Sequence, residues 1–133
     1  MYRVRIYYKD TDMGGVVYYG NYLRFFEAAR TEFLRDLGAD LTRWMKEGIT
    51  FVVVRAEVDY LASARYDDLL AVETTCAALS GARFDLSYRV VREGDGRLMV
   101  TGMTRMAAVG RTGRPVRIPE EVRKALEEAM GDR

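Results

Sequence analysis

Two aspartates and two glycines stand close together near the start of the chain, in the segment Asp10-Thr11-Asp12-Met13-Gly14-Gly15. Alternating residues before this segment indicate a strand, and apolar residues at helical spacing after it indicate a helix. A carboxylate would then lie beside the free backbone N–H groups at the start of a helix, where negative charge is stabilised. That combination suits acyl transfer. The carboxylate either attacks the carbonyl carbon or activates a water molecule, and the N–H groups hold the developing oxyanion.

The roles of individual residues follow from their places in this segment. Asp12 is the favoured catalytic residue, because it precedes the glycines and faces the expected helix start. Asp10 is interpreted as a turn residue, since aspartate commonly satisfies backbone N–H groups in turns. Gly15 is expected to let a ligand approach the backbone closely. Near Tyr19 the backbone N–H groups lack helical partners, so the main chain there is the candidate oxyanion donor. Glu27, within the helix, is expected to pair with an arginine.

The chain contains no histidine, and this narrows the chemistry. An oxygen or nitrogen leaving group usually needs a proton donor such as histidine. A thiol has a pKa of about 8.5, so a thiolate departs with little help from an acid. An ordinary aspartate, with a pKa of about 4, is ionised at neutral pH and can attack a carbonyl or deprotonate water. The composition therefore favours thioester hydrolysis over ester or amide hydrolysis.

The bulk composition bounds the class of protein. The 133 residues are 49% hydrophobic and 31% charged, which predicts a single domain over residues 1–133. A net charge of +1 gives no electrostatic argument for a nucleic-acid partner or an anionic membrane. No apolar stretch approaches the roughly 20 residues that span a bilayer, and the start does not resemble a signal peptide. A cytoplasmic protein without membrane insertion is the expectation.

Cysteine usage limits metal and redox chemistry. Cys76 is the only cysteine, so no disulfide can form within the chain. With no histidine, a metal site of the usual nitrogen and sulfur ligands is not expected, and no cofactor is implied. Cys76 alternates onto an apolar strand face without a histidine partner, and we expect it to pack inertly in the core.

The elements that must position the site follow from the hydrophobic period. Alternation predicts strands over residues 2–8, 51–61, 69–79, 83–91 and 97–109. Helical spacing predicts helices over roughly 20–37, 41–47 and 119–130, with Asn21 near the N-cap and Gly38 just past the C-terminus of the first. Short glycine-containing turns join the last three strands, which are expected to be antiparallel neighbours. The order favours an α+β fold, with an antiparallel sheet of about five strands and a deeply buried helix on one face.

Two segments carry a resemblance to a known family. The first is Tyr8-Lys9-Asp10-Thr11-Asp12-Met13-Gly14-Gly15-Val16-Val17-Tyr18, continuing through Asn21-Tyr22 into the helix Phe25–Glu32. The second is Tyr60-Leu61-Ala62-Ser63-Ala64-Arg65-Tyr66-Asp67-Asp68-Leu69. They resemble the hotdog-fold acyl-CoA thioesterases. The closest group is the 4-hydroxybenzoyl-CoA thioesterase type, including the bacterial branch associated with the Tol-Pal system. The resemblance covers nearly the whole chain in matching order.

This resemblance implies a sheet wrapped round the long helix, homodimers joined by edge strands and often paired into homotetramers, and acyl-CoA bound at the subunit interface. It implies that Asp12 acts as nucleophile or general base and that a backbone N–H at Tyr19 holds the thioester oxygen. The opposing backbone contact of the family falls near Thr50. Many members of the Tol-Pal branch carry histidine at the position of Tyr19, whereas the hydroxybenzoyl-CoA branch can carry tyrosine.

Three other interpretations stay open on the sequence alone. An aspartate-dependent phosphatase would use Asp10 as nucleophile with magnesium, but such enzymes need a parallel α/β core and a longer chain. A hotdog dehydratase normally needs a histidine. A non-catalytic acyl-CoA-binding protein on the same fold is the alternative outside the enzymes, because a fold does not fix a function.

Overall fold

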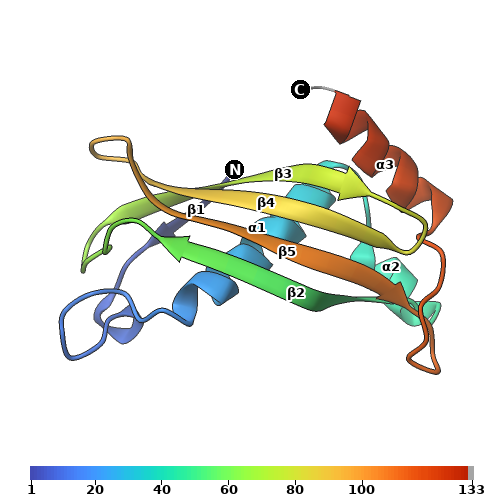
Figure 1. The fold of residues 1–133 in the computed structure, drawn as a ribbon, viewed down its shortest axis with the longest axis horizontal. Helices are drawn as coiled ribbons and strands as arrows, with labels where there is room; N and C mark the ends of the chain where they lie inside the picture. Colours follow the sequence, from blue (N-terminus) through green and yellow to red (C-terminus); the bar gives the residue numbers. More distant parts are fainter. Residues whose placement is uncertain (132–133) are drawn as a thin grey trace.

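The strands form one five-stranded antiparallel sheet that curls around a central helix. The computed structural model describes residues 1–131, and the sheet order is β1-β3-β4-β5-β2. The strands are β1 (Tyr2–Arg5), β2 (Thr50–Tyr60), β3 (Leu69–Leu79), β4 (Arg83–Arg92) and β5 (Arg97–Val109). The helices are α1 (Asn21–Asp36), α2 (Leu41–Lys46) and α3 (Glu120–Gly131). Figure 1 shows α1 crossing one face of the sheet, so the predicted α+β architecture is confirmed.

Aromatic packing holds α1 close to the sheet. The Phe26 ring stacks on the Tyr88 ring of β4, with centroids 4.3 Å apart and an interplanar angle of 7°. On β5, a Cβ atom added to Gly102 would lie 2.5 Å from Phe26 Cε2. The missing side chain at Gly102 therefore allows the helix to approach the sheet. The apolar stripe of α1 is buried as predicted, through Tyr22, Phe25, Phe26, Ala29 and Leu34.

The strand faces alternate as the sequence predicts. On β4 the buried residues are Phe84, Leu86, Tyr88 and Val90. On β3 the Cys76 side chain is 1% exposed, which confirms its expected place in the core. The buried Tyr88 and Thr104 hydroxyl groups share a hydrogen bond of 2.6 Å. Burial raises the pKa of the Tyr88 phenol, and the bond to Thr104 partly offsets this.

The first strand is shorter than predicted, because a side chain intervenes. The expected strand over residues 2–8 ends at Arg5, and a 3-10 helix follows at Tyr8–Asp10. The Asp10 carboxylate accepts a 2.9 Å hydrogen bond from the Tyr7 N–H, which gives this backbone a local alternative to the sheet. Tyr8, expected on the same face as Tyr2, is 74% exposed instead.

The end of α1 follows the predicted pattern. Gly38 has a φ of +84°, and its N–H donates to the Arg35 carbonyl at 2.9 Å. The N–H of Ala39 donates to the Leu34 carbonyl at 2.9 Å, which completes a Schellman motif. Within residues 1–131 no helix combines the length and apolar character needed to cross a membrane.

The two sides of the sheet end differently. At one side β1 is only four residues long, and α3 packs against β3. At the other side β2 is eleven residues long, and among the described residues no element pairs with its outer edge. The pairing of β2 with β5 is interrupted by a bulge at Val54, which falls out of the predicted alternation. The outer edge of β2 is therefore the longest strand edge without a paired neighbour among the described residues.

Candidate active site

Asp12 begins a tight turn that ends in glycine. The Asp12 N–H donates to the Val16 carbonyl at 2.9 Å, and its carbonyl accepts from the Gly15 N–H at 3.0 Å. Asp12 Oδ1 accepts from the Gly14 N–H at 2.8 Å, and Oδ2 has no protein partner among residues 1–131. Gly15 has a φ of +79°, a conformation that favours glycine. The turn thus presents an exposed carboxylate with one oxygen available to a ligand.

Asp10 has a different and structural role. It is 4% exposed, and its carboxylate is engaged by the Tyr7 N–H, so its interpretation as a turn residue is confirmed. The Asp10 carbonyl accepts from the Tyr18 N–H at 3.0 Å and from Asn21 Nδ2 at 2.8 Å. Asn21 lies directly beside the N-cap, as expected, but its side chain does not cap the helix. Gly20 occupies the N-cap, and the Asn21 amide fastens the start of α1 to the loop carrying the Asp12 turn.

The entry to α1 leaves two neighbouring N–H groups free. The N–H groups of residues 21–23 each donate to the carbonyl three residues earlier, at 3.0, 3.3 and 3.2 Å. The N–H groups of Tyr19 and Gly20 have no acceptor within the part of the chain that the structure describes. Two adjacent free donors form a potential oxyanion site. Tyr19 was predicted for this role, whereas Gly20 was missed, although a glycine directly before a helix start is a signal for such a site.

The second family-like segment packs directly against the first. The Val17 N–H donates to the Ala64 carbonyl at 2.9 Å. The rings of Tyr8 and Tyr66 stack with their centroids 4.1 Å apart and an interplanar angle of 7°. These contacts bring residues more than 40 positions apart to the same edge of the site.

An exposed aromatic patch lies where β2 ends. The Tyr60 hydroxyl donates to the Tyr19 carbonyl at 3.3 Å, and the two rings lie 5.0 Å apart. Met13 at the tip of the Asp12 turn is fully exposed. An exposed apolar patch of this kind marks a contact surface. Its members are Tyr19, Tyr60 and Leu61, and Met13 and Tyr18 are further exposed apolar residues of the same loop as Tyr19.

A cation also reaches the Asp12 turn. Arg65 Nη1 lies 3.9 Å from the position that a Cβ atom on Gly15 would take. Within residues 1–131 the Arg65 guanidinium forms no ion pair. Sequence reasoning assigned Arg65 no role, because its proximity depends on the antiparallel bridge between Val16 and Arg65.

Thr50 does not join the other predicted site residues within one chain. It is the first residue of β2 and pairs with Val109 of β5, whereas Tyr60, at the other end of β2, contacts Tyr19. Eleven residues of strand extend for about 33 Å. A single chain therefore places Asp12 and Gly15 in one turn and Tyr19 at the helix entry that follows it, and leaves Thr50 at a distance.

A separate groove lies between β1 and α1. It has a volume of about 590 Å³ and is lined by Asp10 and Glu27, among other residues, but not by Asp12 or Tyr19. Glu27 forms no ion pair with an arginine in the described chain, so its predicted pairing is wrong. The Asp12 carboxylate therefore faces the open surface of the protomer and not this groove.

Comparison with known proteins decides the family. Residues 7–126 match the sequence model of the thioesterase-like superfamily. The chain belongs to this superfamily. It is 42% identical over 126 residues to the acyl-CoA thioesterase YbgC of Haemophilus influenzae, an alignment that covers 92% of this chain and 90% of that protein.

Solved structures agree with this membership of the thioesterase-like superfamily. The hypothetical protein TT1821 of Thermus thermophilus has a TM-score of 0.90 at 35% identity, covering 96% of this chain and 97% of that one. Gentisyl-coenzyme A thioesterase BH1999 has a TM-score of 0.86 at 26% identity, covering 94% and 98%. The predicted hotdog fold is confirmed.

Proposed function

We propose that this chain is an acyl-CoA thioesterase, which hydrolyses the thioester of an acyl-CoA to a free acid and CoA, and that Asp12 is its nucleophile or general base. The observation that carries the proposal is the exposed Asp12 carboxylate on a turn fastened to a helix entry with two free N–H groups. Superfamily membership and the similarity to a named acyl-CoA thioesterase support the reaction class.

The proposed chemistry needs no histidine. In the general-base route Asp12 takes a proton from water while the water oxygen bonds to the thioester carbonyl carbon. In the nucleophilic route an Asp12 oxygen bonds to that carbon, and water later hydrolyses the resulting anhydride. In both routes the Tyr19 and Gly20 N–H groups hold the carbonyl oxygen as it becomes negative, and the C–S electron pair leaves with the thiolate. Both routes release one carboxylic acid and one molecule of CoA.

Within this class we propose the 4-hydroxybenzoyl-CoA type, with its Tol-Pal-associated branch. A backbone oxyanion site tolerates the tyrosine that this chain has at position 19, because only the main chain is used. The proposed compartment is the cytoplasm, where a lone cysteine stays reduced. The acyl-CoA itself is the proposed partner, with no nucleic acid.

The active form is proposed to be a homodimer, or a homotetramer built from such dimers, joined through β2. The unpaired edge of β2 is eleven residues long and ends in the exposed aromatic patch. Natural proteins generally protect an edge of this length, and pairing with a second copy would do so. Antiparallel pairing about a twofold axis places the start of β2 in one copy beside the end of β2 in the other. Thr50 of a second copy would then face Tyr19 and Gly15, as the family resemblance implies.

The proposal is tested by thiol release over a panel of short-chain, long-chain and aromatic acyl-CoAs. Asn at position 12 keeps an oxygen that accepts from the Gly14 N–H, so Asp12→Asn should preserve the turn and remove the reactive carboxylate. We expect kcat to fall by about 10²-fold or more, with substrate still bound. Full activity in Asp12→Ala would contradict the assigned role.

The same assay separates the proposal from its alternatives. A non-catalytic acyl-CoA-binding protein would bind the panel in calorimetry without releasing thiol. An aspartate-dependent phosphatase is disfavoured by the fold, since the sheet is antiparallel throughout and the Asp10 carboxylate is occupied by the Tyr7 N–H. Magnesium-dependent phosphatase activity that Asp10→Asn abolishes would revive that alternative.

A further inference from the structure

A small hairpin after β5 concentrates positive charge. Residues 110–117 contain Arg111, Arg114 and Arg117 and no acidic residue, so this segment carries +3 while the whole chain carries +1. The hairpin is held by its backbone, because the Gly110 N–H donates to the Arg114 carbonyl at 2.9 Å and the Val116 N–H donates to the Ala108 carbonyl at 2.9 Å. We call this segment the cationic hairpin.

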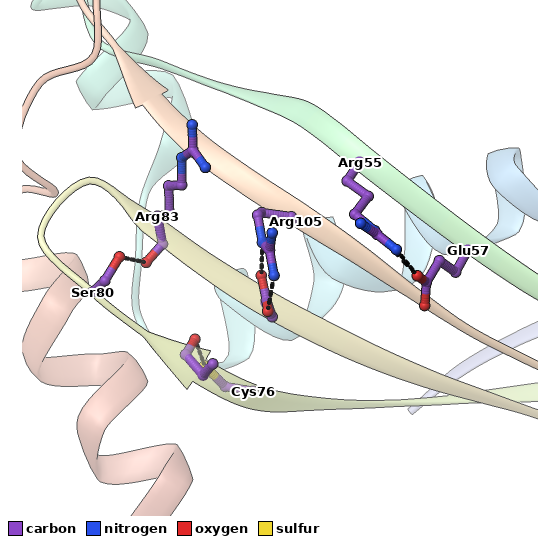
Figure 2. A network of polar contacts seen from close by, with 8 residues as sticks. Arg55, Glu57, Cys76, Ser80, Arg83 and Arg105 are labelled. Carbon is purple, nitrogen blue, oxygen red and sulfur yellow. Dashed lines mark hydrogen bonds and ion pairs between the residues drawn. The ribbon is translucent and has the colours of Figure 1, made fainter.

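The arginines of the cationic hairpin lack acidic partners. All three are exposed, and none lies in an ion pair among the residues described. Two arginines of the sheet contrast with them, because Arg55 pairs with Glu57 and Arg105 pairs with Asp85 (Figure 2). Unpaired guanidinium groups on an ordered hairpin are suited to bind an anion, and arginine matches phosphate geometry particularly well.

Arg111 is positioned by a glycine. A Cβ atom on Gly48 would lie 2.5 Å from both Cγ and Nε of Arg111 and 2.9 Å from its Cζ. The Arg111 side chain therefore lies directly across the Gly48 backbone, where any larger residue would displace it. Gly48 precedes β2 by two residues, and Thr50 pairs with Val109 at the base of the hairpin. The cationic hairpin is thus fixed at the start of β2.

Within one chain this hairpin lies far from Asp12. Figure 1 shows the loop after β5 at one end of β2 and the loop before α1 at the other. Pairing through β2 would bring the hairpin of one copy towards the Asp12 turn of the other, because the start of β2 in one copy would lie beside Tyr60 of the other. Neighbouring strands lie about 5 Å apart, so β5 of the second copy, with its hairpin, comes within about 10 Å of the strand that contacts Tyr19.

We propose that the cationic hairpin of one copy binds the phosphate groups of the acyl-CoA whose thioester reacts at Asp12 of the other copy, with Arg111 as the principal contact. This inference rests on the proposed function and on pairing through β2. It assigns the long flexible arm of CoA a path along the junction between two copies, from the free N–H groups at Tyr19 and Gly20 to the hairpin. Each site would then need residues from both chains.

The first test compares a full substrate with a truncated one. Arg111→Gln, and the triple variant R111Q/R114Q/R117Q, are assayed with an acyl-CoA and with the matching acyl-pantetheine thioester, which has no phosphate. We expect KM for the acyl-CoA to rise about tenfold in Arg111→Gln and further in the triple variant, with kcat nearly unchanged. KM for the acyl-pantetheine should stay at the wild-type value.

Lys124→Gln is the matched control, because it also removes one unpaired positive charge. Lys124 lies on α3, which packs against β3, three positions from β2 in the strand order. This substitution should leave both KM values unchanged. An equal rise in KM for both substrates in the hairpin variants, or no rise for either, overturns the hairpin assignment. Hydrolysis of acyl-pantetheine by the wild-type enzyme would leave the proposed function standing in either case, whereas absence of thiol release from both substrates would overturn both.

The second test asks whether the hairpin acts on its own chain or on its neighbour. Asp12→Ala and the triple hairpin variant are coexpressed with different tags, and the mixed dimer is purified. If the hairpin serves the other copy, the intact Asp12 meets the intact hairpin, and one site per mixed dimer regains the wild-type KM. If the hairpin serves its own chain, every site stays defective. Recovery of wild-type KM is the expected result, and its absence overturns the proposal.

Discussion

The Tyr60 hydroxyl donates a 3.3 Å hydrogen bond to the backbone carbonyl of Tyr19. That carbonyl belongs to the same planar peptide group as the Gly20 N–H, one of the two free donors at the entry to α1. The bond from Tyr60 therefore restrains the direction in which the Gly20 N–H points. A residue at the end of β2 thus orients a donor that lies forty positions earlier in the chain.

Tyr60→Phe removes this restraint while keeping the ring. Because the Tyr19 carbonyl keeps its 3.3 Å hydrogen bond from the Tyr22 N–H, the free energy of unfolding should change by less than about 0.5 kcal/mol. We expect kcat to fall by about three- to tenfold, since a misaligned donor stabilises the oxyanion less well. Tyr66→Phe is the control, because it keeps the stacking on Tyr8 and should leave kcat unchanged. Equal kcat in the two variants would remove the positioning role of Tyr60.

Substitutions of Asp10 should affect stability, whereas substitutions of Asp12 should affect activity. Asp10→Ala removes the buried acceptor of the Tyr7 N–H and should lower the free energy of unfolding by about 1–3 kcal/mol. Asp10→Asn keeps an acceptor oxygen and should retain most of the thioesterase activity, in contrast to Asp12→Asn. Urea unfolding and thiol release measured on the same preparations check this. Loss of activity in Asp10→Asn as deep as in Asp12→Asn, with stability intact, would reverse the two roles.

Gly102→Ala should be destabilising, because the added Cβ would lie 2.5 Å from the Phe26 ring and 3.0 Å from the Glu57 carbonyl oxygen. The ring is stacked on Tyr88 and cannot easily withdraw. A loss of about 1–3 kcal/mol is expected in urea unfolding. Gly94→Ala provides the comparison, since nothing lies within 4 Å of its added Cβ. Adding Phe26→Leu should recover part of the loss, and strictly additive effects would argue against the clash.

Alkaline pH should destabilise the protein through its buried tyrosines. Burial raises the pKa of Tyr88 and of Tyr22, so their ionisation is harder in the folded than in the unfolded state. The stability that they contribute is complete below the unfolded pKa of about 10 and is lost as pH rises above it. Tyr88→Phe should cost about 1 kcal/mol at pH 8, from the bond to Thr104, and should flatten the decline above pH 10. Urea midpoints at several pH values measure both effects, and an unchanged decline would contradict this assignment.

The sheet and central helix were predictable because their signals are local and periodic. The strands at 69–79 and 97–109 have their predicted bounds, and α1 lies within one residue of its prediction at each end. The first strand was overextended, because the Asp10 side chain satisfies the Tyr7 N–H and ends the alternation early. Competition of this kind between a side chain and the backbone leaves no trace in hydrophobic period.

The site was only partly predictable, because some of its residues are far apart in the sequence. Asp12 and the helix entry are neighbours in sequence, so their proximity followed from local pattern. Tyr60 and Arg65 reach the same loop through contacts with distant residues, Tyr60 with Tyr19 and Arg65 with Val16. Arg111 reaches Gly48 only because β2 and β5 are paired. Contacts set by strand register depend on the whole fold and cannot be assigned from one segment.

The unequal sides of the sheet have a consequence for assembly. Across residues 1–131 β2 offers the longest row of backbone groups without a paired strand, since β1 pairs with Leu69–Val72 of β3 and α3 packs against β3. In two copies joined symmetrically through β2, the unpaired backbone groups of both β2 strands would all form hydrogen bonds with each other. Growth by strand addition would then stop at a pair, which protects the protein from polymerising into fibres.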